Sequence, residues 1–249
     1  MSRVSNSTLG MALVLCMASA AWAQQPPKGL FSLEIRGDIG PYPIGLNVTL
    51  RDYSQVVSAH YFYVSRLADI PLNARTEGET VRFEEPGGGA FLLHLTSNGP
   101  AKGYPLTFYN STGLKGTWTQ GGRTLPVTLR FESGDIGPPP ARWYSHVTNE
   151  SDVVFEARVR RFLRAAMAGD KDTVARGVSY PLRVNGARRL TIRTKADLLA
   201  HWDEIFTPQL MTKLRKAVPH EMFVHEYGAM IGNGEVWFDA NGVTSINTR

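Results

Sequence analysis

The chain has 249 residues, 43% of them hydrophobic, so it is long enough for one large domain or two of ordinary size, each with a buried core. The formal net charge is +5, which is modest for this length. Lysine and arginine are scattered rather than gathered on one face with aromatic residues, and this argues against a nucleic-acid-binding protein. The one local arginine cluster, in residues 158–164, is interpreted as the solvated back of an amphipathic helix, with an anionic partner as the alternative.

Residues 1–23 have the features of a secretory signal peptide. Arg3 lies near the start, an apolar run follows at 9–21, and a small-x-small cleavage pattern ends at Ala23. The run is too short for a spanning helix, and no later segment is long and apolar enough for one. We therefore expect export to the periplasm or the medium after cleavage near Ala23. The only cysteine, Cys16, lies in this leader, so the mature chain would depend on core packing without disulfides.

Residues 24–132 are predicted to form an all-β antiparallel meander, barrel-like or sandwich-like. In 44–50, Ile, Leu and Val alternate with Gly, Asn and Thr, the period-two pattern of a half-buried strand. Further short strands are predicted at 57–64, 70–75, 80–84, 90–95, 106–108, 113–119 and 125–131. Short strands with regular turn signals favour a closed or nearly closed sheet.

Three aromatic residues of this half have two interpretations. Trp118, Tyr61 and Tyr63 either plug one end of a barrel or line the mouth of a ligand site, and the plug is favoured because buried aromatic residues usually serve packing. The triple glycine at 87–89 lacks the Lys-Ser/Thr and the helix of a phosphate loop, so a hairpin tip is expected.

Residues 133–141, SGDIGPPPA, are interpreted as a linker because three consecutive prolines form a stiff extended spacer. The second domain, 142–249, is predicted to be α+β. Helices are expected over 155–166 and 172–176, after the capping box of Thr194, and after Thr207-Pro208. Asn-Gly pairs predict a hairpin at 185–186 and a three-stranded meander in 223–247. Helices packed on a curved antiparallel sheet would build a cone around a cavity.

This order of elements resembles the nuclear transport factor two-like superfamily, a cystatin-like cone that includes SnoaL-like cyclases and ketosteroid isomerases. Residues 180–184 (YPLRV), 204–208 (EIFTP) and 230–238 (MIGNGEVWF) are also similar to segments of a group of uncharacterised exported bacterial two-domain proteins. The resemblance covers about 153–247, and the β half is less specifically similar to a domain often joined to it. It implies a cone fold and export, but no assigned activity.

Isomerase-like members of that superfamily use an inward carboxylate and a hydrogen-bond donor. The corresponding catalytic candidates are Asp203 as base, His225 and Tyr227 on one face of a predicted strand, and Tyr180 as a further donor. None of them lies in a recognised motif, so no catalytic role is assigned. If the cavity instead binds a ligand, the expected contacts are Trp202, Trp237, Arg183 and Glu235.

Two His-Glu pairs raise the question of a metal. A metalloprotease helix needs His-Glu-x-x-His, but after His220-Glu221 the position of the second histidine is held by Val224, and His225 lies in a predicted strand. The sequence therefore predicts no metal site, and no cofactor.

The favoured function is an exported, periplasmic, non-catalytic binding or interaction protein for a small apolar ligand or an envelope protein. The alternatives are a cone-fold isomerase or hydrolyase and an inhibitor or immunity-type protein of the cell envelope. By analogy, a homodimer through the open sheet face is a further expectation.

Overall fold

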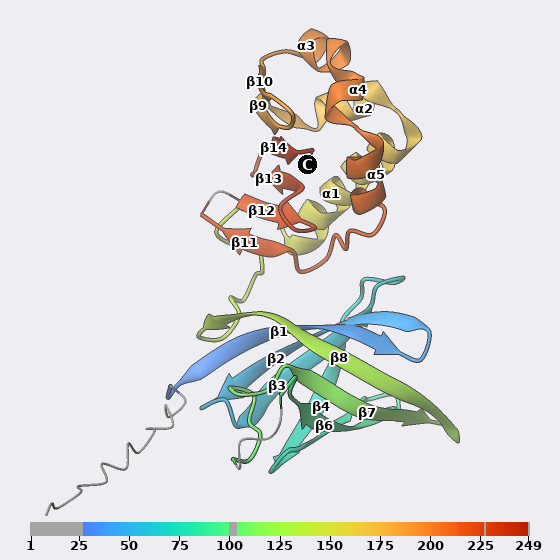
Figure 1. Cartoon of the computed structure of the whole chain (residues 1–249), viewed down its shortest axis with the longest axis vertical. Coiled ribbons are helices and arrows are strands. Elements are labelled where there is room, and N and C mark those ends of the chain that lie inside the picture. The colour runs from blue at the N-terminus through green and yellow to red at the C-terminus, as the bar shows by residue number, and fades with distance from the viewer. Residues whose placement is uncertain (1–26, 100–103, 227, 249) are drawn as a thin grey trace, which may run out of the picture.

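The computed structural model describes residues 27–99, 104–226 and 228–248, and the predicted leader lies outside them. The chain forms two halves, a closed β-barrel and a six-stranded sheet with helices (Figure 1). Among the described residues, no helix combines the length and the hydrophobicity that crossing a membrane requires.

The first half is a closed eight-stranded barrel in which every neighbouring pair is antiparallel. Its strands are β1 (Leu30–Ile39), β2 (Tyr42–Arg51), β3 (Gln55–Tyr63), β4 (Ile70–Glu77), β5 (Thr80–Glu84), β6 (Ala90–Thr96), β7 (Gly113–Gln120) and β8 (Arg123–Ile136). Alternate side chains point inward and fill the interior, among them Ile35, Leu46 and Phe83. The predicted all-β half is thus confirmed in its barrel form.

Two details of this half differ from the sequence prediction. Residues 106–108 do not form a strand, because the Asn110 side chain accepts a hydrogen bond from Thr107 N at 2.6 Å and closes a turn. Strand β8 continues to Ile136, inside the predicted linker, because β1 pairs with it as far as Phe31↔Ile136. The prolines at 138–140 follow directly after that pairing ends.

The second half begins with helices and ends with strands. In chain order it contains α1 (Asp152–Ala168), α2 (Lys171–Arg176), β9 (Val178–Asn185), β10 (Arg189–Ile192), α3 (Lys195–Ala200), α4 (Trp202–Ile205), α5 (Pro208–Leu214), β11 (Phe223–His225), β12 (Gly228–Ile231), β13 (Val236–Phe238) and β14 (Val243–Asn247). Gly169 ends α1 at φ 68°, the Thr194 side chain forms the predicted capping box with Asp197, and Thr207 caps α5.

The sheet has the strand order β10-β9-β14-β13-β12-β11. The pair β14–β9 is parallel, so the sheet is mixed rather than antiparallel as predicted. The Asn-Gly turns lie where predicted, but residues 223–231 form a hairpin, not one strand: Val224 pairs with Ala229. This reversal requires glycine at position 228, because the Cβ of any other residue would collide with the Phe238 carbonyl.

The helices α1, α2, α4 and α5 cover one side of this sheet (Figure 1). A hydrophobic cluster that includes Phe162, Trp202, Phe206 and Phe238 packs between the helices and the sheet. The rings of Trp202 and Phe206 lie 4.2 Å apart. Beside this cluster is a pocket of about 290 Å³, which residues of α1, α2 and β13 line, among them Phe162 and Phe238.

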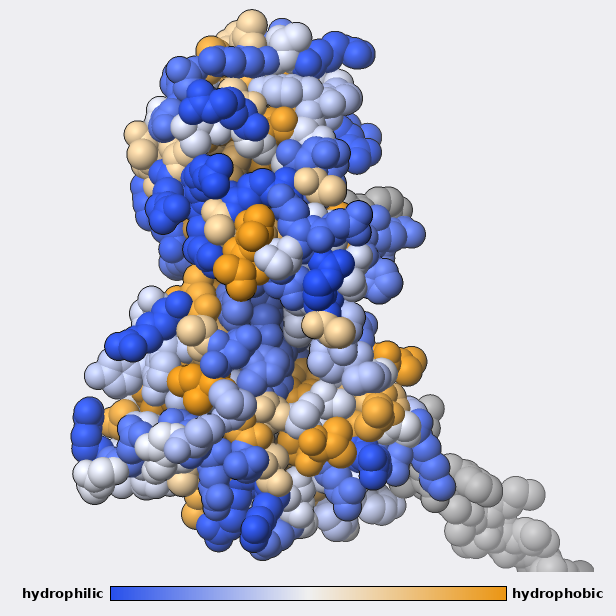
Figure 2. Space-filling view, turned by 180° about the vertical axis from the view of Figure 1, so that it is seen from behind, coloured by the Kyte–Doolittle hydropathy of each residue, from blue (hydrophilic) through white to orange (hydrophobic). Residues whose placement is uncertain are grey.

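The two halves are in direct contact beyond the linker. Strand β2 is buried from Ile44 to Leu50 on both of its faces. Leu46 packs inside the barrel, while Asn47 on the opposite face hydrogen-bonds Glu221 of the second half. Figure 2 shows a waist where the halves meet, with hydrophobic and polar surface close together.

Candidate functional site

Strand β3 presents an aromatic side chain to the second half. Phe62 is 0% exposed although it is absent from the barrel core cluster. The His220 ring meets it edge-on at 4.4 Å, and the Arg36 guanidinium lies 5.0 Å from its ring. Phe62 is therefore buried by the contact between the halves rather than by the barrel itself.

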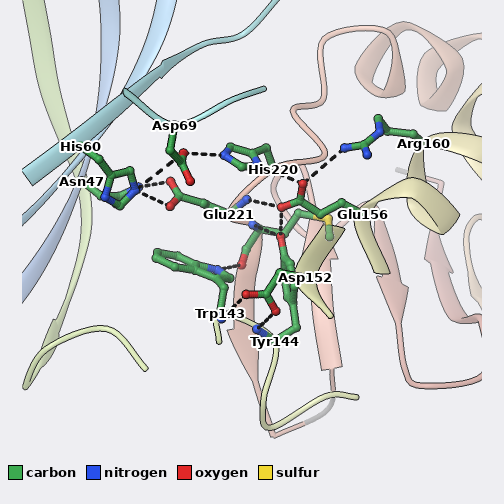
Figure 3. Close-up of polar contacts among 11 residues, drawn as sticks. Asn47, His60, Asp69, Trp143, Tyr144, Asp152, Glu156, Arg160, His220 and Glu221 are labelled. Atoms are coloured by element: carbon green, nitrogen blue, oxygen red, sulfur yellow. Dashed lines mark hydrogen bonds and ion pairs between the residues drawn. The ribbon is translucent and has the colours of Figure 1, made fainter. Parts of the chain in front are cut away.

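Beside Phe62, side chains from both halves form a partly buried polar network (Figure 3). His60 Nε2 lies 2.5 Å from Glu221 Oε1, and Asn47 Nδ2 donates to the other carboxylate oxygen. Glu221 is 6% exposed and has a φ of 46°, a backbone conformation that residues with side chains adopt mainly at constrained sites.

His220 connects the barrel to helix α1. Its Nε2 is 2.9 Å from Asp69 Oδ1, in the loop between β3 and β4, and its Nδ1 is 2.8 Å from Glu156 Oε2. Because both ring nitrogens face carboxylates, the imidazolium form, which donates from both, fits this position.

Glu156 is the inner anchor of the network. It accepts hydrogen bonds from the Tyr144 hydroxyl at 3.0 Å and from Glu221 N at 3.2 Å, and it pairs with Arg160 at 3.3 Å. Tyr144 is fully buried and accepts a hydrogen bond from Met222 N at 2.9 Å. Every buried carboxylate of the network thus has donors, as burial of charge requires.

The electrostatics of the network follow from these contacts. Burial lowers the pKa of His220, but hydrogen bonds to Asp69 and Glu156 outweigh it and raise the pKa to about 9. Burial also lowers the pKa of His60, but the hydrogen bond to Glu221 and the charge of Glu221 raise it, so the pKa of His60 is raised overall. The hydrogen bond from His220 lowers the pKa of Asp69. The carboxylates thus favour charged histidines despite burial.

Three side chains of the network could hold a metal ion. His60, Asp69 and Glu221 each offer one ligand atom, and these atoms lie within 4.8 Å of one another. One imidazole and two carboxylates form a ligand set used by zinc and related transition metals. The prediction of no metal site considered only ligands close together in the sequence.

A groove of about 380 Å³ lies next to the network. It is bordered by β1, β2, β3 and β8 on one side and by the start of the second half and β11 on the other. Asn47 and His60 line it together with apolar side chains that include Ile136, Trp143 and Phe223. Ile136 is 91% exposed and Phe223 36%, so this apolar surface is open to a partner molecule.

Two carboxylates give the groove an acidic wall. Glu34, on β1, and Asp135, on β8, both line it. Burial raises the pKa of Glu34, Arg36 and a hydrogen bond from Ser133 lower it, and the charges of Glu221 and Asp135 raise it further. A cation in the groove would relieve this repulsion between carboxylates.

The three catalytic candidates that the structure describes lie on three different elements. His225 is exposed on β11 and Asp203 is exposed on α4, while Tyr180 is half-buried and donates to the Ala175 carbonyl at 3.3 Å. Tyr227 lies outside the described residues. The single strand expected over 223–231 is interrupted, because Phe223–His225 pairs antiparallel with Gly228–Ile231, and the pairing of His225 with Tyr227 stays a prediction.

The four predicted ligand contacts lie in different surroundings. Arg183 and Trp237 line a cleft of about 390 Å³ on the sheet. Trp202 is instead buried in the core at 9% exposure. Glu235 accepts a hydrogen bond from Asn233 N and pairs with Lys213 at 3.1 Å, so it stabilises the β12–β13 turn.

The barrel aromatics meet at a carboxylate. Tyr61 and Trp118 both donate to Glu85 Oε1, at 2.7 and 2.6 Å, and both are nearly fully buried, as the plug interpretation requires. Tyr63 and Trp118 also border an open cleft of about 410 Å³. Tyr61 and Trp118 therefore belong to the barrel core, and Tyr63 and Trp118 also contribute to a surface cleft.

Sequence reasoning missed the residues that the fold brings together. His60 and Glu221 are 161 positions apart, and His220 and Asp69 are 151 apart. The only local signal was the His220-Glu221 pair, which was rejected because a helical spacing was assumed. No protein-family model matches the chain, and neither the curated proteins nor the solved structures contain a significant match.

Proposed function

We propose that the protein is an exported, non-catalytic binding protein whose ligand occupies the groove between its two halves. The observation that carries the proposal is the groove itself, whose exposed apolar lining stands beside the carboxylates of Glu34 and Asp135. The predicted leader supports export. The resemblance to nuclear transport factor two-like proteins stays a prediction, and it carries no activity to this protein.

The ligand is a small molecule with an apolar body and a protonated amine. The apolar body packs against Ile136, Trp143 and Phe223, and the amine donates to Glu34. Trp143 is held in place because its indole N–H donates to Met222 O at 2.8 Å and its backbone N–H donates to Asp152 at 2.7 Å. A rigid aromatic wall reduces the entropy lost on binding.

The test compares three molecules with the same six-carbon body: hexylamine, hexanol and hexanoate. Isothermal titration calorimetry should show that hexylamine binds best and hexanoate worst. A hydrogen bond to a charged group contributes about 1 kcal/mol more than a neutral one, so we expect a preference of roughly five- to tenfold for the amine over the alcohol.

Two variants locate the site. Glu34→Gln should remove the preference for hexylamine and leave hexanol binding unchanged, whereas Ile136→Ser should weaken both. Glu77→Gln, at an exposed position on β4, is the matched control. Absence of binding by all three molecules, or an amine preference that survives Glu34→Gln, would refute this ligand class.

A further inference from the structure

We infer that His60, Asp69 and Glu221 form a binding site for a divalent transition-metal ion that joins the two halves of the protein. His60 and Asp69 belong to the barrel and Glu221 to the second half, so the ion would be bound across their contact (Figure 3). This site adjoins the groove, which His60 also lines, but it uses none of the residues proposed to bind the amine or its apolar body.

The ligand atoms lie close enough together for small side-chain movements to bring them around one ion. His60 Nε2 is 2.5 Å from Glu221 Oε1, which is a hydrogen-bond distance, and 3.9 Å from Asp69 Oδ1. Neighbouring ligands of a tetrahedral zinc ion lie about 3.3 Å apart, because each metal–ligand bond is about 2.0–2.1 Å long. An ion would therefore displace the proton between His60 and Glu221, move these two side chains apart and draw Asp69 inward.

Neighbouring side chains hold the ligands from behind. His220 donates to Asp69 at 2.9 Å and is itself fixed by Glu156, while Asn47 donates to the free oxygen of Glu221. Such partners orient ligands and strengthen metal binding. His220 is not itself a ligand, because both of its ring nitrogens are engaged with carboxylates.

The donor atoms select the class of ion. An imidazole nitrogen with two carboxylate oxygens suits zinc, cobalt and manganese, whereas magnesium and calcium prefer oxygen alone. Three protein ligands leave a further position for water. Because the ion requires both halves, its binding stabilises their contact by an amount that grows with the logarithm of its concentration relative to the dissociation constant.

Zinc is titrated into the whole protein after EDTA treatment has removed bound metal ions and dialysis has removed the EDTA. Calorimetry should show one zinc ion per chain, and a thermal scan should show a rise in Tm. Cobalt, as a spectroscopic substitute, should give visible absorption bands of a bound ion, which competition with zinc removes.

Substitutions assign the site. Asp69→Asn should weaken zinc binding by about tenfold or more. Its matched control is Asp38→Asn, an exposed aspartate of the same barrel, which should not change zinc binding. His60→Gln, which retains a donor toward Glu221, should abolish the cobalt bands. His94→Gln, whose side chain lies 3.1 Å from the Thr80 hydroxyl at an exposed position of the barrel, should preserve them. Absence of saturable zinc binding, or equal binding by Asp69→Asn and Asp38→Asn, would overturn the inference.

Discussion

Removing the Phe62 ring should separate the two halves without unfolding the barrel. Phe62 is 0% exposed, and its ring contacts His220 and Arg36 instead of the barrel interior. Truncation of a fully buried phenylalanine to alanine costs about 3–5 kcal/mol. For Phe62→Ala this loss should fall on the contact between the halves, because the barrel core cluster does not include the residue.

The assay follows both halves during unfolding. Calorimetry of Phe62→Ala should resolve two transitions with the barrel transition unchanged, and trypsin should cut after Arg142, just beyond the linker, faster than in the parent protein. Phe83→Ala is the matched control, since Phe83 is equally buried but lies inside the barrel. If Phe62→Ala lowers the barrel transition as much as Phe83→Ala does, or leaves cleavage after Arg142 unchanged, the reasoning is refuted.

Three further predictions concern the barrel and the groove. Gly45→Ala should destabilise the contact between the halves by about 1–3 kcal/mol in urea unfolding, because a Cβ at this position collides with the Phe62 ring. Gly99→Ala is the control and should have no such effect, because there is open space around Gly99. Equal effects of the two substitutions would contradict this reasoning. Glu85→Ala should lower the stability of the barrel by about 2 kcal/mol, because the buried donors of Tyr61 and Trp118 lose their acceptor. Glu84→Ala, at the exposed neighbouring position, is the control and should have little effect. Hexylamine affinity should fall as the pH drops from neutral through the pKa of Glu34, which burial raises above its usual 4.5, because the carboxylate then loses its charge while the amine keeps its own. A pH-independent affinity, or the same fall in Glu34→Gln, would contradict the last of these.

The elements of the fold were largely predictable, but two of their arrangements were not. The alternation in 44–50 indicated a strand, and the structure confirms it, yet the same pattern holds for a strand with one solvated face. The contact with Glu221 of the second half explains why Asn47, on the outer face of the strand, is only 7% exposed. Residues 223–231 alternate like one strand, and the reversal at Gly228 depends on close approach to the Phe238 carbonyl, which no local pattern reveals.

By itself the sequence determined the local structure: the barrel strands, the Asn-Gly turns and the helix caps. It could do so because side-chain periodicity and turn chemistry act between residues a few positions apart. Only the tertiary structure decided where the candidate site lies. The docking of the two halves brings together His60, Asp69 and Glu221. Their charge and burial depend on neighbours more than 150 positions away in the chain.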